Sequence, residues 1–258
     1  SVIHNLHIIF LAQQREQVMN TTITQIKAHK SIRAYTDQPI SAEQLDEILA
    51  AAQQAPSSSF LQAASIIRIT DKALRAQIMQ LSAEQAYIAG AAEFLLFCAD
   101  FNRHKQIVPD AKTGFVEQLL IGATDAAMMG QNALVAAESL GLGGVYIGAV
   151  RNHPAEISEL LGLPELVVPL FGLCLGYPAQ DPQVKPRLPR ALVVHENHYQ
   201  PLNKTLLAQY DDEMRAYYAS RTSNNKDQSW SSQITAILSK EARPYMLSYL
   251  QQQGYCKK

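Results

Sequence analysis

The sequence predicts an α+β fold in which a mostly antiparallel sheet of about four central strands is flanked by helices. Two kinds of pattern indicate it: short apolar runs bounded by turn residues, typical of buried strands, and longer stretches with helical periodicity. Their order along the chain is irregular rather than strictly alternating. Irregular order favours antiparallel or mixed pairing and argues against a doubly wound parallel sheet.

The expected strands are short segments rich in apolar residues, at 65–69, 94–99, 145–150 and 167–175. The expected helices cover 21–30, 42–55, 71–81, 116–140, 154–161, 204–220, 230–240 and 244–252. Several carry start and stop signals. Ser41 and Gln44 form a capping box, Asp71 caps the next helix, and Gly141 and Gly162 follow helix ends.

The helix expected at 116–140 is apolar or small on nearly all sides, since glycine and alanine recur at 122, 123, 126, 127, 130, 133, 136 and 137. Such a helix in a soluble protein is buried all round, either in a core or across a subunit interface. We favour the interface.

Composition limits the domain organisation and the partners. A chain of 258 residues exceeds the commonest domain size, yet α+β enzymes of this length often fold around one core. We expect a single domain at 19–258, preceded by a non-native or disordered extension at 1–18, because Met19 begins a more protein-like segment. The net charge of −1 gives no field that would hold a polyanion, so we expect no nucleic-acid partner.

The cysteines and apolar runs indicate the compartment. Cys98 and Cys174 lie in apolar runs as small buried hydrophobes, and Cys256 is far from both, so a reducing cytoplasm fits best. The longest strongly apolar stretches are far below the roughly 20 residues that span a bilayer, and we expect no membrane association.

A basic segment near the N-terminus could hold a phosphate. His29, Lys30 and Arg33 place three potentially cationic groups around Ser31 and Ile32. A solvated basic turn is the alternative.

A serine-rich loop follows the helix at 42–55. Ser57, Ser58 and Ser59 precede Phe60, and together they could offer N–H groups, hydroxyls and an aromatic face to a flat polar ligand. An ordinary structural loop is the alternative. No G-x-S-x-G elbow surrounds these serines, so a nucleophilic hydrolase is poorly supported.

A glycine-rich stretch at 141–148 resembles a dinucleotide fingerprint only superficially. The third glycine of G-x-G-x-x-G would fall at Tyr146, and the stretch follows a helix instead of opening one. We expect glycine here to let the backbone approach a ligand closely.

Positive side chains also occur in two later stretches. Lys185 and Arg187 lie in a proline-rich run at 178–189, which must be extended and could present two fixed charges to an anion. Arg221 and Lys226 flank a polar loop that could meet a second phosphate. An exposed linker and a solvated connection between helices are the respective alternatives.

A metal site is not expected. His195 and His198 are spaced H-x-x-H, but they belong to no H-E-x-x-H pattern and have no cysteine pair nearby.

Taken in order, four of these motifs closely resemble the nitroreductase superfamily: HKSIRAYTDQPIS, SSSFLQ, GLGGVYIGAVR and LGYPAQDPQVKPRLP. Within it, the chain resembles the group of oxygen-insensitive NADPH nitroreductases of type A and NADPH-flavin oxidoreductases, from about Met19 to the C-terminus. The resemblance implies a nitroreductase-like fold, an intertwined homodimer with FMN bound between the subunits, and a C-terminal arm that embraces the partner.

The resemblance also assigns roles to residues. It implies that the FMN is bound by residues of all four motifs and by one glutamine: His29, Lys30, Ser31, Ile32, Arg33, Ser57, Ser58, Ser59, Gln85, Tyr146, Ile147, Gly148, Ala149, Lys185 and Arg187. Ala149 departs from relatives that often have a second glycine there. Arg221 matches the arginine expected to hold the 2′-phosphate of NADPH, with Lys226 in support, and we expect Phe60 to form a platform for the acceptor.

The expected reaction is hydride transfer from NADPH through FMN to nitroaromatics, nitrofurans or quinones, with ping-pong kinetics. Lys185 is expected to act as an electrostatic stabiliser, and no side chain is expected to act as an acid, base or nucleophile. Two alternatives stay open: an NADPH-flavin reductase that supplies free reduced flavin, and a non-enzymatic flavin carrier.

Overall fold

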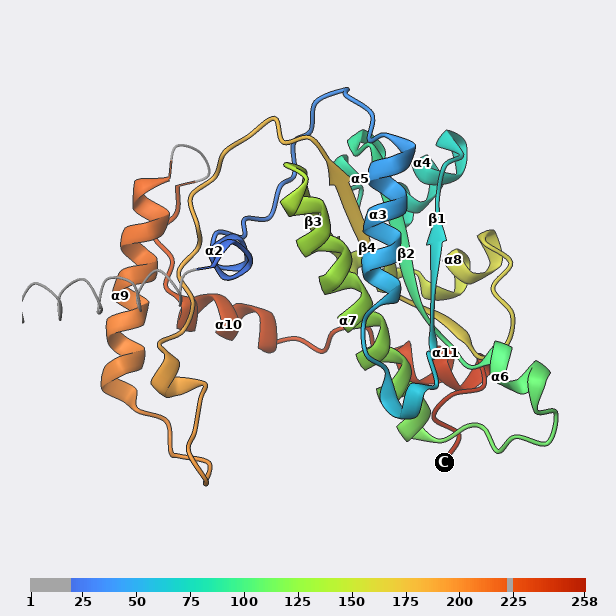
Figure 1. Cartoon of the computed structure of the whole chain (residues 1–258). Helices are drawn as coiled ribbons and strands as arrows, with labels where there is room; N and C mark the ends of the chain where they lie inside the picture. The colour runs from blue at the N-terminus through green and yellow to red at the C-terminus, as the bar shows by residue number, and fades with distance from the viewer. Residues whose placement is uncertain (1–19, 222–224) are drawn as a thin grey trace, which may run out of the picture. The chain divides into compact units, whose positions relative to one another are not determined.

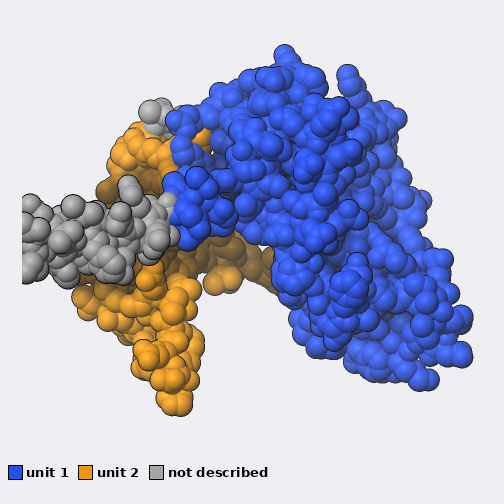
Figure 2. Space-filling model, in the orientation of Figure 1, with its two compact units in different colours: residues 1–181, 245–258 blue, residues 182–244 orange. Residues whose placement is uncertain are grey.

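The computed structural model describes residues 20–221 and 225–258, so the expectation about residues 1–18 lies outside the described residues. Contacts divide the chain into two compact units (Figure 2). One runs up to Asp181 and includes Tyr245–Lys258, and the other is Pro182–Pro244.

The first unit contains an antiparallel sheet with the strand order β1-β2-β4-β3 (Figure 1). Its strands are β1 (Ala64–Arg68), β2 (Glu93–Asp100), β3 (Gly143–Ile147) and β4 (Val167–Gly176). This confirms the predicted α+β class and the four antiparallel strands. Both boundaries of β3 were wrong, because the strand begins at Gly143 and ends at Ile147, and residues 148–152 form a 3₁₀ turn.

The two central strands form the middle of the core. Every residue of β2 is buried, as predicted for a fully buried strand, and most of β4 is buried as well. Cys98 and Cys174 lie on these strands, and burial raises the pKa of each thiol to about 12. Both cysteines are therefore neutral, packed side chains at physiological pH.

Helices cover the sheet. In the first unit they are α2 (Thr21–Lys27), α3 (Ala42–Gln53), α4 (Lys72–Leu81), α5 (Tyr87–Gly90), α6 (Asn102–Ile107), α7 (Val116–Ser139), α8 (Pro154–Leu160) and α11 (Met246–Gln252). The predicted capping box of Ser41 and Gln44 is present at the start of α3, and the Asp71 side chain accepts from Leu74 N at the start of α4. None of the described helices is long and apolar enough to cross a membrane.

Helix α7 packs against α3 and against all four strands. Its small residues permit this close packing: a Cβ at Gly122 would lie 2.6 Å from Ala99 Cβ, and one at Gly130 would lie 2.9 Å from the Phe171 ring. Burial is not all round within one chain, since Leu120 is 56% exposed. This apolar side chain is available to a partner, and the expected interface stays a prediction.

The second unit is helical, with η3 (Arg190–Leu192), α9 (Lys204–Ser220) and α10 (Trp230–Leu238). Its small core consists of Tyr210, Met214 and Tyr218, with Trp230 packed against it. The segment at 180–189 forms neither helix nor strand, as the prolines predicted.

Candidate functional site

The basic segment lies against the edge strand β3. Ser31 forms a parallel bridge with Gly144, and Ile32 N donates to Gly144 O at 3.0 Å. Ile32 is buried, and a Cβ at Gly143 would lie 2.5 Å from its Cγ1. Gly143 therefore lets the segment 29–33 approach the sheet, whereas a Cβ at Gly144 would lie 2.8 Å from Cys174 O on β4.

Two of the cationic groups have acidic partners in this chain. His29 Nδ1 lies 2.5 Å from Glu138 Oε1 on α7, and Lys30 Nζ donates to Asp181 Oδ1 at 2.5 Å. Arg33 is exposed to solvent. A phosphate bound here would meet Arg33 in solvent, whereas His29 and Lys30 would have to share their donors with carboxylates.

The serine loop has an unusual backbone. Ser59, Phe60 and Gln62 have φ values of 48°, 57° and 54°, in the left-handed region that residues other than glycine rarely adopt. Ser57 Oγ accepts from Gln62 N at 3.2 Å and closes the loop. Phe60 is 80% exposed, so its ring is free to form the expected platform.

Gln85 lies between α4 and α5, and its Oε1 is a buried atom without a hydrogen-bond partner in the described part of the chain. Buried acceptors are normally paired, so this amide oxygen fits a donor supplied by a ligand. The N–H group of the flavin pyrimidine ring is a donor of that kind. The residues present thus fit the expected FMN at this position.

The stretch from Tyr146 to Ala149 offers mainly backbone. Ile147 is only 1% exposed, and Ala149 packs against the same hydrophobic cluster, to which Ile88 of α5 also belongs. This shared cluster brings Gln85 and the 148–152 turn to the same side of the sheet. Tyr146 is half-exposed and its ring meets Phe171 edge to face at 5.4 Å.

In the second unit, one aromatic ring contacts two of the predicted cations. Lys185 Nζ lies 5.3 Å from the centroid of the Tyr218 ring, and Arg221 Cζ lies 5.8 Å from it. Both distances fall within the range of cation–π attraction. The residue expected to serve FMN and the one expected to serve NADPH are therefore close together.

The other two cations of this unit are placed differently. Arg187 Nη1 donates to Lys185 O at 2.6 Å, a local bond between the side chain and the backbone of the same segment. Lys226 is exposed and lines a hollow of about 540 Å³ that also involves Arg215 and Asn225. Part of the polar loop, residues 222–224, lies outside the described residues.

Sequence reasoning missed several residues that hold these elements. Asp125 is buried in α7 and binds the serine loop, and Tyr218 contacts Lys185 and Arg221. A signal for Asp125 was available, because it lies in the middle of a helix that is otherwise rich in apolar and small residues, whereas the other acids, Glu117 and Glu138, lie near the helix ends. The rings of His195 and Tyr199 lie 4.6 Å apart and are tilted by 41°. Across residues 20–221 and 225–258, no group of three His, Cys, Asp or Glu side chains could hold a metal ion.

Comparisons with known proteins agree with this geometry. The sequence signature of the nitroreductase family matches residues 26–177, and that of the C-terminal domain of the family matches residues 185–258. The oxygen-insensitive NADPH nitroreductase of Salmonella typhimurium is 57% identical over 237 residues, covering 92% of this chain and 99% of that protein. The NADPH-flavin oxidoreductase of Vibrio harveyi is 53% identical over 240 residues, covering 93% and 100%.

Solved structures have the same fold. Nitroreductase A from Vibrio parahaemolyticus gives a TM-score of 0.90 at 51% identity, covering 93% of this chain and 100% of that one. The NADPH:FMN oxidoreductase from Vibrio harveyi complexed with NAD+ gives 0.88 at 50% identity, with coverage of 93% and 100%. The predicted nitroreductase-like fold is confirmed, and the chain belongs to the nitroreductase family.

Proposed function

We propose that this chain is an FMN-dependent oxidoreductase that takes hydride from NADPH and reduces nitroaromatics, nitrofurans and quinones in two-electron steps. The observation that carries the proposal is the 57% identity, over nearly the whole length of both chains, to an oxygen-insensitive NADPH nitroreductase. The unpaired Gln85 oxygen and the pair of cations on Tyr218 support it from the structure.

A bound FMN would supply the hydride-transfer chemistry between NADPH and the acceptor. The chain supplies binding and charge. Lys185 provides a positive charge where the reduced ring becomes negative, Arg33 and Arg187 serve the phosphate, and Arg221 with Lys226 holds the NADPH 2′-phosphate. Phe60 gives the acceptor an aromatic surface on which to stack. Proximity and electrostatics then supply the acceleration, and no acid–base pair is required.

The sheet topology supports a homodimer whose sites draw on both chains. The basic segment docks on β3, whereas the serine loop leads into β1, so these two motifs lie at opposite edges of the sheet (Figure 1). Three strand spacings amount to about 14 Å, and the register offset between Gly144 and Ala64 adds about 20 Å along the strands. Helix α7 packs across all four strands between them. This separation supports a site that takes the two motifs from two copies of the chain.

Complementation between variants tests this arrangement. Arg33→Ala damages the basic segment, and Phe60→Ala damages the serine loop. If each site combines the two motifs from different chains, a mixed dimer has one intact site, and equal co-expression should restore up to about a quarter of the wild-type activity. Activity that never exceeds the mean of the two separate variants would contradict shared sites.

A second function is favoured by the 53% identity to a Vibrio NADPH-flavin oxidoreductase: the same pocket could accept free FMN and release it reduced. Competition kinetics separate the two functions. At equal, subsaturating concentrations, a nitroaromatic acceptor should have the higher kcat/KM. A larger kcat/KM for free FMN would make flavin reduction the principal activity.

A further inference from the structure

The serine loop is held in a conformation that its own residues do not favour. Ser59, Phe60 and Gln62 all have left-handed backbone angles, and none of them is glycine. Such conformations persist only where the surroundings hold them, and they concentrate at functional sites. Within the loop, Leu61 N donates to Ser58 O at 2.9 Å and Gln62 N to Ser57 Oγ at 3.2 Å. These local bonds close the loop on itself but do not attach it to the rest of the fold.

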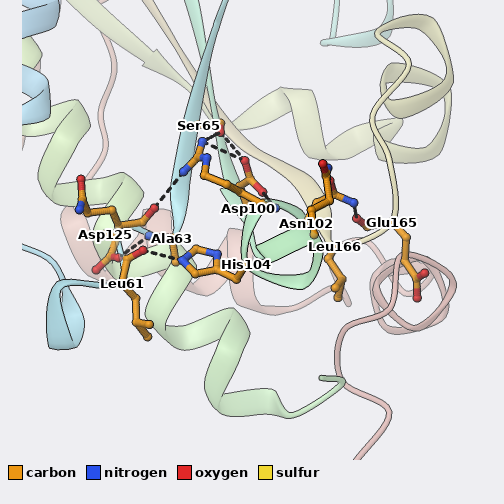
Figure 3. A network of polar contacts seen from close by, with 12 residues as sticks. Leu61, Ala63, Ser65, Asp100, Asn102, His104, Asp125, Glu165 and Leu166 are labelled. Atoms are coloured by element: carbon orange, nitrogen blue, oxygen red, sulfur yellow. Dashed lines mark hydrogen bonds and ion pairs between the residues drawn. The ribbon is translucent and has the colours of Figure 1, made fainter. Parts of the chain in front are cut away.

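A buried carboxylate fixes both ends. Asp125 on α7 is 2% exposed, and its two oxygens accept separate backbone bonds, from Ser58 N to Oδ1 and from Ala63 N to Oδ2, each at 3.0 Å (Figure 3). Aspartate is required by this geometry. An asparagine offers one acceptor oxygen, and its amide would face the second N–H group donor to donor.

Helix α6 binds the carbonyls of the same loop. His104 Nε2 lies 2.5 Å from Leu61 O, and since a carbonyl only accepts, this nitrogen carries the proton (Figure 3). Arg103 Nη1 donates to Gln62 O at 3.3 Å, while its Nη2 donates to Ser65 Oγ at 2.8 Å and to Asp100 at 3.3 Å. The loop is thus held by an acceptor on its N–H groups and by donors on its carbonyls.

We propose that Asp125, supported by His104, is the positioning residue that holds the serine loop in its left-handed conformation and so presents Phe60 to the electron acceptor. The inference rests on the proposed function, because it assigns Phe60 to acceptor binding. The 80% exposure of Phe60 fits this role, since the ring contributes little to the core of its own chain. Because Asp125 is buried, it acts through Phe60 rather than through the solvent-facing surface of the site.

The test compares Asp125→Asn with Glu93→Gln in the FMN-loaded protein. Glu93 is a buried carboxylate on β2 whose partner is Arg68, at the end of β1 away from the loop, so it controls for neutralising a buried acid. Asp125→Asn should lower kcat/KM for a nitroaromatic about tenfold, mainly through KM, because it leaves a buried N–H unpaired. Glu93→Gln should change it less than about twofold.

A double-variant cycle distinguishes positioning from general damage. In a Phe60→Ala background, Asp125→Asn should have almost no further effect, because the ring on which it acts is gone. An equal tenfold loss in both backgrounds would overturn the proposal, as would an unchanged KM in the single variant. If Asp125→Asn does not fold, His104 provides the same test: His104→Gln, which retains a donor, should keep the wild-type KM, and His104→Leu should not.

Hydrogen exchange of the protein without flavin tests the loop independently of activity. Amides of the segment 57–63 should exchange faster in Asp125→Asn than in the wild-type protein or in Glu93→Gln. Unchanged exchange would overturn the proposal. If the wild-type protein reduced no acceptor, the proposed function would be refuted. The exchange rates would still test whether Asp125 holds the loop, because they do not depend on activity.

Discussion

Replacing Gly143 by alanine tests whether the basic segment must dock closely on β3. An added Cβ would lie 2.5 Å from Ile32 Cγ1, 3.0 Å from Ile32 Cβ and 3.1 Å from Pro178 Cγ. The first distance is far inside van der Waals contact, and Ile32 is only 5% exposed, so its side chain cannot turn into solvent. Either the segment 29–33 moves off the sheet or the strand shifts.

The expected cost follows from these contacts. Overpacking of this kind costs about 1–3 kcal/mol, and the reduced entropy of the unfolded chain offsets about 0.4–1 kcal/mol of it. A net ~1–2 kcal/mol lowers the Tm by roughly 2–8 °C. The segment is attached to β3 through Ile32 N, whereas the strand is held by its whole ladder with β4, so the segment should move first. Binding of FMN must then bring the segment back to its docked position. The Kd for FMN should therefore rise about tenfold.

Flavin titration and thermal unfolding measure the two effects, with Gly90→Ala as the control. Gly90 has nothing within 4 Å of an added Cβ, so both quantities should stay near their wild-type values. The double variant Gly143→Ala/Ile32→Ala should lose less unfolding free energy than the two single variants lose together, because the second change removes the clashing atom. If Gly143→Ala left both the Tm and the FMN Kd unchanged, the close approach of the two segments would be refuted.

Three further substitutions separate the roles of the other site residues. Arg221→Ala should raise the NADPH KM by roughly 10- to 100-fold in steady-state assays, because it removes an interaction that stabilises bound NADPH and the transition state equally. Flavin content and kcat should stay nearly constant. An unchanged KM would refute the assignment. Lys185→Ala should lower either the flavin occupancy or the rate of flavin reduction by NADPH roughly tenfold in stopped-flow traces, and normal values for both would exclude it as the stabiliser. Gln85→Met should keep or raise the Tm of the flavin-free protein, because it removes a buried unpaired acceptor, and it should weaken FMN binding about tenfold. A lower Tm without weaker FMN binding would show that the partner of the Gln85 oxygen lies in the protein.

Local signals predicted most helix starts and ends, although α2 ends at Lys27 and not at residue 30 as expected. The capping box at Ser41 and Gln44 and the glycines after α7 and α8 depend on a few neighbouring residues, so they can be recognised from sequence. Short elements such as α5 and α6 were not predicted, because four or six residues carry too little periodicity. The end of β3 was placed too late. Past Ile147 the chain turns, and Arg151 reaches back to donate to Leu170 O on β4.

The segments of the candidate site could be named from the sequence alone. Motif order along the chain identified the segments, since that information is present in the sequence. The backbone angles at Ser59 and Phe60 could not be predicted, because they depend on Asp125 and His104, which are distant in sequence. Likewise, the convergence of Lys185 and Arg221 on one tyrosine arises from tertiary packing in the second unit. The motifs therefore indicate which residues belong to the candidate site, whereas contacts between distant segments determine the conformation of those residues.

An anaerobic spectral titration of the purified protein with NADPH tests the account most directly. We predict that the protein binds FMN, is yellow, loses its flavin absorbance when NADPH is added and regains it when a nitroaromatic acceptor follows. A colourless protein that takes up no FMN when it is supplied, or a flavin that NADPH does not bleach, would contradict it.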